Sequence, residues 1–148
     1  MPWTPRTTVA VIAEREGRFL FVLEWVKGRQ VINQPAGHLE ENEHFIQAAI
    51  RETREETAWR FQPQGLVGVY RWRIPTQGPT YVRYCFHGQV DDHRPDQPLD
   101  DGVIEALWLT PDEARSGRFR LRSPMVLRCL EDYLSGQNYP LELINEMD

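Results

Sequence analysis

Residues 37–59, GHLEENEHFIQAAIRETREETAW, constrain the fold of this chain more than any other stretch. Helical periodicity predicts a helix over residues 43–57 with Asn42 as its N-cap. The stripe expected to face the core consists of Ile46, Ala49, Ile50, Thr53 and Thr57. Three acidic side chains at i, i+3 and i+4 share a different, exposed face: Glu52, Glu55 and Glu56. The fold must therefore place three carboxylates next to one another.

Neighbouring carboxylates repel, and each like-charged i,i+4 pair costs about 0.2–0.5 kcal/mol even in water. A hard cation between them removes that cost, and carboxylate oxygens suit Mg²⁺ or Mn²⁺. The spacing therefore predicts a divalent-metal site. The alternative is a solvated helix face, on which Arg51 and Arg54 pair with the acids.

The full spacing of this segment resembles the Nudix box, G-x5-E-x7-R-E-U-x-E-E-x-G-U, in which U is a bulky aliphatic residue. The matching positions are Gly37, Glu43, Arg51, Glu52, Glu55 and Glu56. Thr53, Ala58 and Trp59 depart from the pattern. They affect packing and the helix end, where a glycine usually takes a left-handed conformation, and they remove no metal ligand.

The resemblance implies a Nudix hydrolase that uses Mg²⁺, or Mn²⁺ in its place, to cleave a phosphoanhydride. The implied metal ligands are the backbone carbonyl of Ala36 and the carboxylates of Glu52, Glu55 and Glu56. Glu43 and Arg51 are implied to pair and to hold the preceding loop against the helix. A carboxylate would accept the proton of the attacking water. The candidates for this base are Glu52, Asp101 and Glu105, and Glu105 has the alternative of an outward-facing strand residue.

The rest of the chain alternates between strand and helix patterns. Strands are expected at residues 7–13, 19–25, 31–32, 66–74, 80–90 and 103–109, with helices starting at Pro111 and at Ser123-Pro124. Pro35 is expected to end the third strand. This order predicts an α/β fold, an α/β/α sandwich with a mixed β-sheet, and a single domain over residues 1–148.

Composition narrows the class of protein further. The net charge of -5 argues against a nucleic-acid polymer as partner, because such proteins usually carry a basic face. No apolar run is long enough to span a membrane and no leader is evident, so we expect a cytoplasmic protein. Cys85 and Cys129 lack metal-site spacing and are expected to be buried free thiols.

The substrate is expected to be a small molecule that contains a diphosphate. Candidate binding residues are Gln34, Arg71, Trp72 and Arg83, each with the alternative of an ordinary strand or surface role. Residues 33–40, 121–124 and 135–144 resemble one bacterial phosphatase of the family, which implies nucleoside di- or triphosphates or thiamine-type pyrophosphates as substrates. ADP-ribose, nucleotide sugars and dinucleoside polyphosphates remain alternatives. So do a non-catalytic binding module and a structural protein with an incidental acidic helix.

Overall fold

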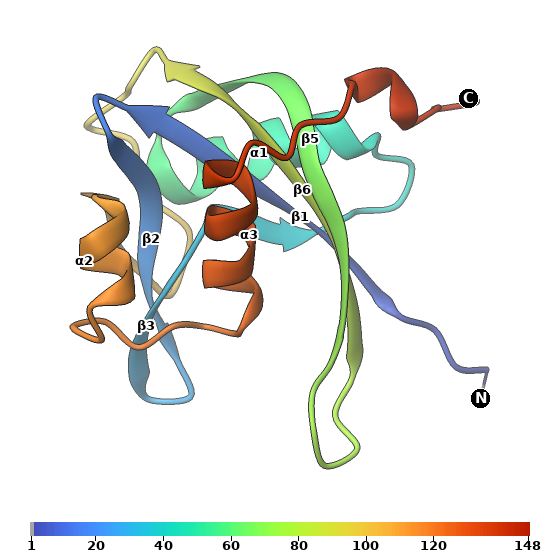
Figure 1. The fold of residues 1–148 in the computed structure, drawn as a ribbon, viewed down its shortest axis with the longest axis horizontal. Coiled ribbons are helices and arrows are strands. Elements are labelled where there is room, and N and C mark those ends of the chain that lie inside the picture. Colours follow the sequence, from blue (N-terminus) through green and yellow to red (C-terminus); the bar gives the residue numbers. More distant parts are fainter. Residues whose placement is uncertain (1) are drawn as a thin grey trace.

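The computed structural model describes residues 2–148. Its strands are β1 (Arg6–Arg15), β2 (Arg18–Val26), β3 (Arg29–Asn33), β4 (Ala36–His38), β5 (Arg60–Arg73), β6 (Thr80–Asp91) and β7 (Val103–Leu109). Its helices are α1 (Phe45–Thr57), α2 (Pro111–Arg115) and α3 (Met125–Leu134), followed by the 3-10 turn η1 (Leu141–Leu143). Figure 1 shows how these elements follow one another.

The strands form a mixed sheet in the order β3-β2-β1-β6-β5, with β4 paired to β1 and β7 paired to β2. The pairing of β1 with β6 is parallel, and the other pairings are antiparallel. β1 and β2 pair only beside their connecting turn, at Glu14↔Phe19 and Arg15↔Arg18. Away from this turn the two strands separate: β1 pairs with β4 and β6, whereas β2 pairs with β3 and β7.

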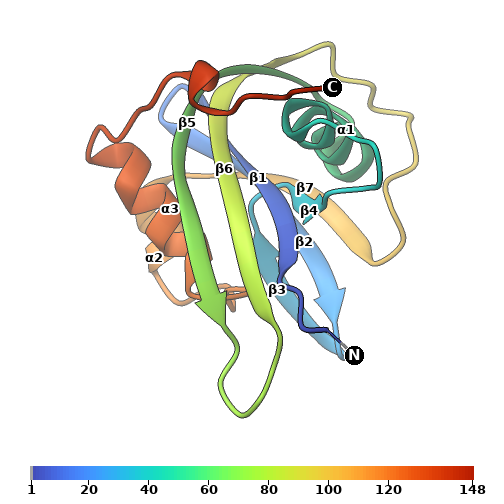
Figure 2. The same cartoon turned by 90° about the vertical axis from the view of Figure 1, so that its right-hand side faces the viewer.

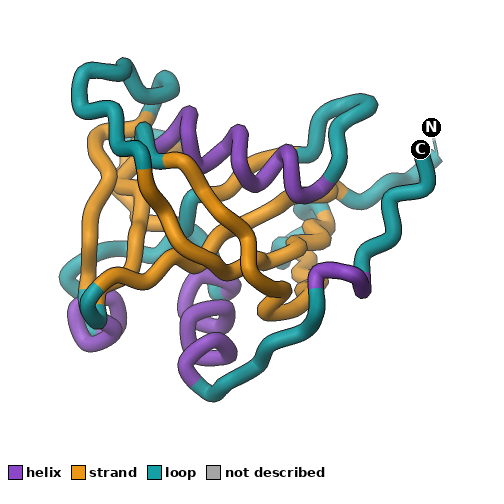
Figure 3. Tube along the Cα trace, turned by 90° about the horizontal axis from the view of Figure 1, so that it is seen from above, coloured by secondary structure: helices purple, strands orange, loops and turns teal. Residues whose placement is uncertain are grey.

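Helices cover both faces of the sheet: α1 lies on one side, and α2 and α3 lie on the other (Figures 2 and 3). Successive strand residues point to opposite faces, so β1 supplies both layers of the core. Val9 and Val11 pack in the cluster that contains Ala48 and Ala49 of α1, whereas Ala10 and Ile12 pack with α3. The expected α/β/α sandwich with a mixed sheet is confirmed.

The predicted start of the long helix was wrong. Asn42 has a φ of 63° and lies in a turn, and α1 begins at Phe45 with His44 as its N-cap. The third strand does end before Pro35, but pairing resumes at once, because Ala36–His38 forms β4 against β1. α2 begins at Pro111 as predicted, and Thr110 and Glu113 form a capping box at its start.

Two smaller expectations concern single side chains. Cys85 and Cys129 are buried and free, as predicted. Ala58 takes the left-handed conformation, with φ 64°, that the box usually gives to glycine, so α1 ends in the usual way in spite of the substitution.

Within residues 2–148, no helix is both long enough and apolar enough to cross a membrane.

Candidate active site

The carboxylates of α1 differ in their exposure. The side chain of Glu55 is 40% exposed, whereas Glu52 and Glu56 are buried, with only 8% and 9% of the residue surface exposed. The prediction of one exposed acidic face was therefore wrong for Glu52 and Glu56. They are buried because α1 packs against β4, where Glu52 lies on Gly37 and Glu56 accepts from the N–H of Ala36.

Burial makes the ionised form of these two carboxyls costly. It raises the pKa of Glu52 to about 7 and the pKa of Glu56 to about 9, against an ordinary value of 4.5. The backbone N–H of Ala36 donates to Oε1 of Glu56 at 2.9 Å, which offsets only part of this cost. A divalent cation bound beside these two buried carboxyls would stabilise their ionised form.

Gly37 explains how Glu52 reaches the backbone of β4. A Cβ atom at position 37 would lie 2.2 Å from Cδ and from Oε1 of Glu52, which is far inside van der Waals contact. The φ angle of Gly37 is negative, so glycine is not needed here for a left-handed backbone conformation. Its role is to leave room for the carboxylate. The box glycine and the box glutamate are thus two halves of one contact.

Arg51 joins the loop before α1 to the carboxylates. Its Nε donates to Oε2 of Glu43 at 2.6 Å, and its Nη1 donates to Glu52 and to Glu55 at 2.8 Å each. Its Nη2 donates to Oε1 of Glu43 and to the carbonyl of His38 at 3.1 Å. The hydrogen bond from Arg51 holds the pKa of Glu43 below its ordinary value. Glu43 lies before the helix, which lets it fold back over eight residues to Arg51.

Asp100 completes the acidic cluster, and sequence reasoning missed it. Ligand oxygens of Glu52, Glu55 and Asp100 all lie within 4.8 Å of one another. The backbone N–H of Asp100 donates to the carbonyl of Glu55 at 3.0 Å, which fixes the loop before β7 against the end of α1. An all-oxygen carboxylate set of this kind fits Mg²⁺ or Mn²⁺. The aspartate-rich run DDHRPDQPLDD at residues 91–101 was the available hint, but only Asp101 was singled out.

Glu105 lies elsewhere. It is an exposed residue of β7 that pairs with Leu23 of β2, and it is not part of this cluster. Asp101 is also exposed, in the turn that leads into β7.

A cavity of about 920 Å³ opens beside the acids. It lies between the β1–β4–β5–β6 surface and a second wall made by β2, β3 and residues 120–125. Its lining includes Glu52, Glu56, Gly37, Glu24, Arg6, Thr8, His38, Trp72, Tyr81, Arg83, Arg120 and Arg122. Glu24 is buried and pairs with Arg122 across the cavity wall.

The proposed substrate residues separate into two groups. Trp72 and Arg83 line the cavity. Gln34 is fully buried behind it, where its Oε1 accepts from Nη1 of Arg83 at 2.9 Å and its Nε2 donates to the carbonyl of Val126. Arg71 is exposed and lies outside the lining, because strand alternation turns it away from the face that carries Trp72.

The strand register arranges the cavity floor in rows. Trp72, Tyr81 and Arg6 are successive cross-strand neighbours in one row, and the rings of Trp72 and Tyr81 are 6.4 Å apart at an interplanar angle of 18°. Arg83, Thr8 and His38 form the next row. The nearly parallel rings of Trp72 and Tyr81 therefore border a row that carries the positive charge of Arg83, and Ala36 and Gly37 of β4 lie beyond this row.

This fold and this arrangement of acids define a class of protein. A family model of the NUDIX domain matches residues 3–128, and the chain belongs to the Nudix family of hydrolases. It is an enzyme of the pyrophosphohydrolase class, whose members act on small diphosphate compounds and generally use divalent metal ions.

Individual relatives are similar over nearly the whole chain. The protein named Phosphatase NudJ of Escherichia coli O1:K1 / APEC is 38% identical over 144 residues, covering 97% of this chain and 93% of the relative. Phosphatase NudJ of Shigella flexneri matches equally. Among solved structures, a NUDIX hydrolase from Nitrosomonas europaea has a TM-score of 0.93 and 42% identity, with 97% of both chains covered. A UDP-X diphosphatase with 16% identity and a TM-score of 0.75 shares the fold alone.

Proposed function

We propose that this protein is a Mg²⁺-dependent hydrolase that cleaves a phosphoanhydride bond in a nucleoside di- or triphosphate or a thiamine-type pyrophosphate. The observation that carries the proposal is the convergence of Glu52, Glu55 and Asp100 at the edge of a large cavity, with Glu56 buried beside them. Basic side chains do not balance the negative charge of all four carboxyls. A divalent cation would supply the positive charge that is lacking there.

Glu52, Glu55, Glu56 and Asp100 are the residues that would hold the metal, together with the backbone at Ala36. A divalent ion bound there would neutralise phosphate charge and lower the pKa of a bound water. Glu52 is our candidate for the proton acceptor, because it lines the cavity beside the other carboxylates. Asp101 and Glu105 have less support, because they lie outside the carboxylate cluster and the lining.

The remaining cavity residues suggest how the substrate binds. We propose that an aromatic ring of the substrate lies on Trp72 and Tyr81, and that its phosphate groups extend past Arg83 toward the acids. Residues two apart on a strand are separated by about 6.6 Å, so a ring on one row and a phosphate on the next would lie about that far apart. Asn33 and Gln34 hold both Nη atoms of Arg83 through amide oxygens, which leaves its positive charge without a carboxylate partner among the described residues. Arg71 has no place in this arrangement.

The name Phosphatase NudJ, borne by relatives at 38% identity, supports a phosphate-releasing activity for this chain as well. ADP-ribose, nucleotide sugars and dinucleoside polyphosphates are the competing substrate classes. A non-catalytic module has little support, because all box acids are present and two of them, Glu52 and Glu55, converge with Asp100.

The test is a substrate screen with Mg²⁺ that covers nucleoside di- and triphosphates, thiamine pyrophosphate, ADP-ribose, nucleotide sugars and dinucleoside polyphosphates. We expect phosphate release from the first two classes, loss of turnover in excess EDTA, and recovery with Mg²⁺ or Mn²⁺. Ca²⁺ should not restore turnover, because it prefers longer bonds and more ligands. Turnover in excess EDTA would contradict the metal assignment, and preference for a capped diphosphate would contradict the substrate class.

A further inference from the structure

Residues 139–148, which we call the strap, run from the end of the chain segment after α3 across β5 to the start of α1 (Figures 1 and 2). Tyr139 and Leu66 of β5 exchange two backbone hydrogen bonds of 2.8 Å. Leu141 and Ile144 pack on the core cluster on the α1 side of the sheet. The strap lies beyond residues 3–128, the part that the family model matches. The strap is therefore docked on the same layer of the fold as α1.

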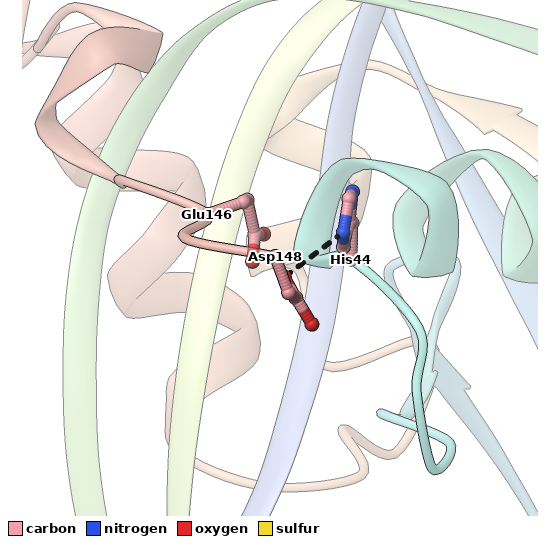
Figure 4. Close-up of side chains that lie close together, drawn as sticks. All are labelled: His44, Glu146 and Asp148. Atoms are coloured by element: carbon pink, nitrogen blue, oxygen red, sulfur yellow. Dashed lines mark ion pairs between the residues drawn. The ribbon is translucent and has the colours of Figure 1, made fainter.

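The strap ends on the first residues of α1. The backbone N–H of Phe45 donates to Oε1 of Glu146 at 2.8 Å, across 101 positions of sequence. Nε2 of His44 lies 3.2 Å from Oδ1 of Asp148, and Figure 4 shows both strap acids beside the helix start. The first turn of α1 has no acidic residue of its own. The strap thus supplies the carboxylate that a helix start favours, for its free N–H groups and its dipole.

The capped residues are continuous with the groups that organise the active site. Glu43 directly precedes His44, and its carboxylate accepts from Arg51 and from the backbone N–H of Glu40. Arg51 in turn contacts Glu52 and Glu55. Any movement of the start of α1 therefore moves the carboxylate that orients Arg51.

We propose that Glu146 is a positioning residue for the metal site. By capping Phe45, it fixes where α1 begins, and this keeps Glu43 in place to hold Arg51 against the metal-binding glutamates. The inference rests on the proposed metal-dependent function. It assigns to the strap a role in cation affinity that packing alone would not give it.

One possible ligand atom from each of His44, Glu146 and Asp148 lies within 4.8 Å of the other two, so a cation bound directly by these three groups is a distinct outcome to be tested. Their geometry favours capping. Oε1 of Glu146 already accepts a backbone N–H, and the side chain of Asp148 is 80% exposed.

The experiment measures Mn²⁺ binding by calorimetry without substrate, and amide hydrogen exchange at Phe45, in the full chain. Glu146→Ala removes the cap, and Glu146→Gln keeps an oxygen that can accept the N–H. The matched control is Glu142→Ala, an exposed strap acid with no side-chain hydrogen bond or ion pair among residues 2–148.

We expect Glu146→Ala to speed exchange at Phe45 and to weaken Mn²⁺ binding about 3–10-fold, at the lower edge of the effect of residues that orient metal ligands. Turnover at saturating metal should change less than about twofold. Glu146→Gln should recover most of the affinity, and Glu142→Ala should match the parent protein.

Three results would overturn the proposal. One is unchanged Mn²⁺ affinity in Glu146→Ala together with a lower Tm, since this is the signature of a structural cap only. Another is loss of a whole bound equivalent of Mn²⁺, which would make the cluster itself a metal site. The third is equal weakening by Glu142→Ala. Failure of the proposed function would look different, because the unsubstituted protein would then neither bind Mn²⁺ at the box nor turn over any diphosphate.

Discussion

At the scale of single residues, the site depends on carboxyls placed where carboxyls are unfavourable. Glu56 is the clearest case. Its pKa of about 9 means that, without metal, it is largely protonated at neutral pH, and its Oε1 still accepts the N–H of Ala36. Glutamine has the same shape, is never charged, and retains that acceptor.

We therefore predict opposite effects of Glu56→Gln on stability and on activity. In EDTA at pH 8, below the pKa of about 9, the Tm should equal or exceed that of the parent, because the variant has no buried carboxyl whose ionisation costs stability. Turnover with Mg²⁺ should fall at least about 100-fold, through the loss of a ligand. Thermal melts and steady-state kinetics measure the two. Near-normal turnover in this variant would remove Glu56 from the metal site.

Gly37 offers a second test at this scale. Gly37→Ala places a methyl group 2.2 Å from the Glu52 carboxylate, which must then move away from β4. We predict that kcat/KM falls at least about tenfold while the Tm changes by no more than about 2–4 °C, the shift for roughly 1 kcal/mol at this chain length.

The control substitution is Gly17→Ala, in the turn between β1 and β2. Gly17 has a φ of 78° and nothing within 4 Å of the added Cβ atom. Alanine there should cost about 1 kcal/mol of stability through backbone strain and leave kcat/KM unchanged. If both variants lose activity equally, the contact of Gly37 with Glu52 is not the cause.

At the scale of elements, sequence reasoning predicted α1 well and its start poorly. Periodicity and the box fix the body of the helix, because both depend on neighbours three and four residues apart. The start depends on Glu43, whose carboxylate is engaged by Arg51 in a tertiary contact instead of serving the first turn. Local capping rules cannot register that competition, and so they placed the start at Asn42.

The position of Asp100 was unpredictable for a similar reason. Contacts distant in sequence bring it to the acids, among them the hydrogen bond from its N–H to the carbonyl of Glu55, 45 positions earlier, and the one from Nε2 of Gln97 to the carbonyl of Arg54. Several neighbouring aspartates offer the same chemistry in the sequence. The burial of Glu52 and Glu56 also follows from β4, which resumes pairing after Pro35 and covers them.

The loop between β4 and α1 carries its own prediction. We expect Glu43→Ala to raise the Mg²⁺ concentration for half-maximal activity about tenfold, with a smaller effect at saturating Mg²⁺, because Arg51 loses the partner that orients it. A Mg²⁺ titration beside a thermal melt measures this. A small loss of stability with an unchanged titration would limit Glu43 to a structural role.

At the scale of the whole molecule, the sandwich was predictable because alternating β-branched strands must be covered on both faces. The cavity was not, because it forms where β1 and β2 separate after their short pairing and residues 120–125 close the gap. Folding thus buries the acids and opens the cavity together. The unfavourable free energy of burying the acids therefore lowers the stability of the entire fold.

This link predicts an unusual pH dependence for the metal-free protein. Glu52 and Glu56 have folded pKa values of about 7 and about 9, against 4.5 when exposed, so between these limits the folded state binds more protons than the unfolded state. Stability then decreases as pH rises through this window, by linkage. The low pKa of Glu43 acts in the opposite sense, but its contribution is complete above its ordinary value of 4.5. In EDTA, we expect the Tm to drop by several degrees from pH 6 to pH 9, since about 1 kcal/mol corresponds to about 2–4 °C at this size.

Mg²⁺ should reverse the trend, because it binds the ionised carboxyls and competes with protons only at the lower pH values. The decisive comparison is the variant with both Glu52→Gln and Glu56→Gln, which has no proton to release in this window. Its Tm should stay nearly constant from pH 6 to pH 9 in EDTA, and Mg²⁺ should stabilise it much less than the parent. A parent protein whose metal-free Tm rises with pH over this range would show that these carboxyls are ionised in the folded state, and the cation would then not be needed to offset their burial.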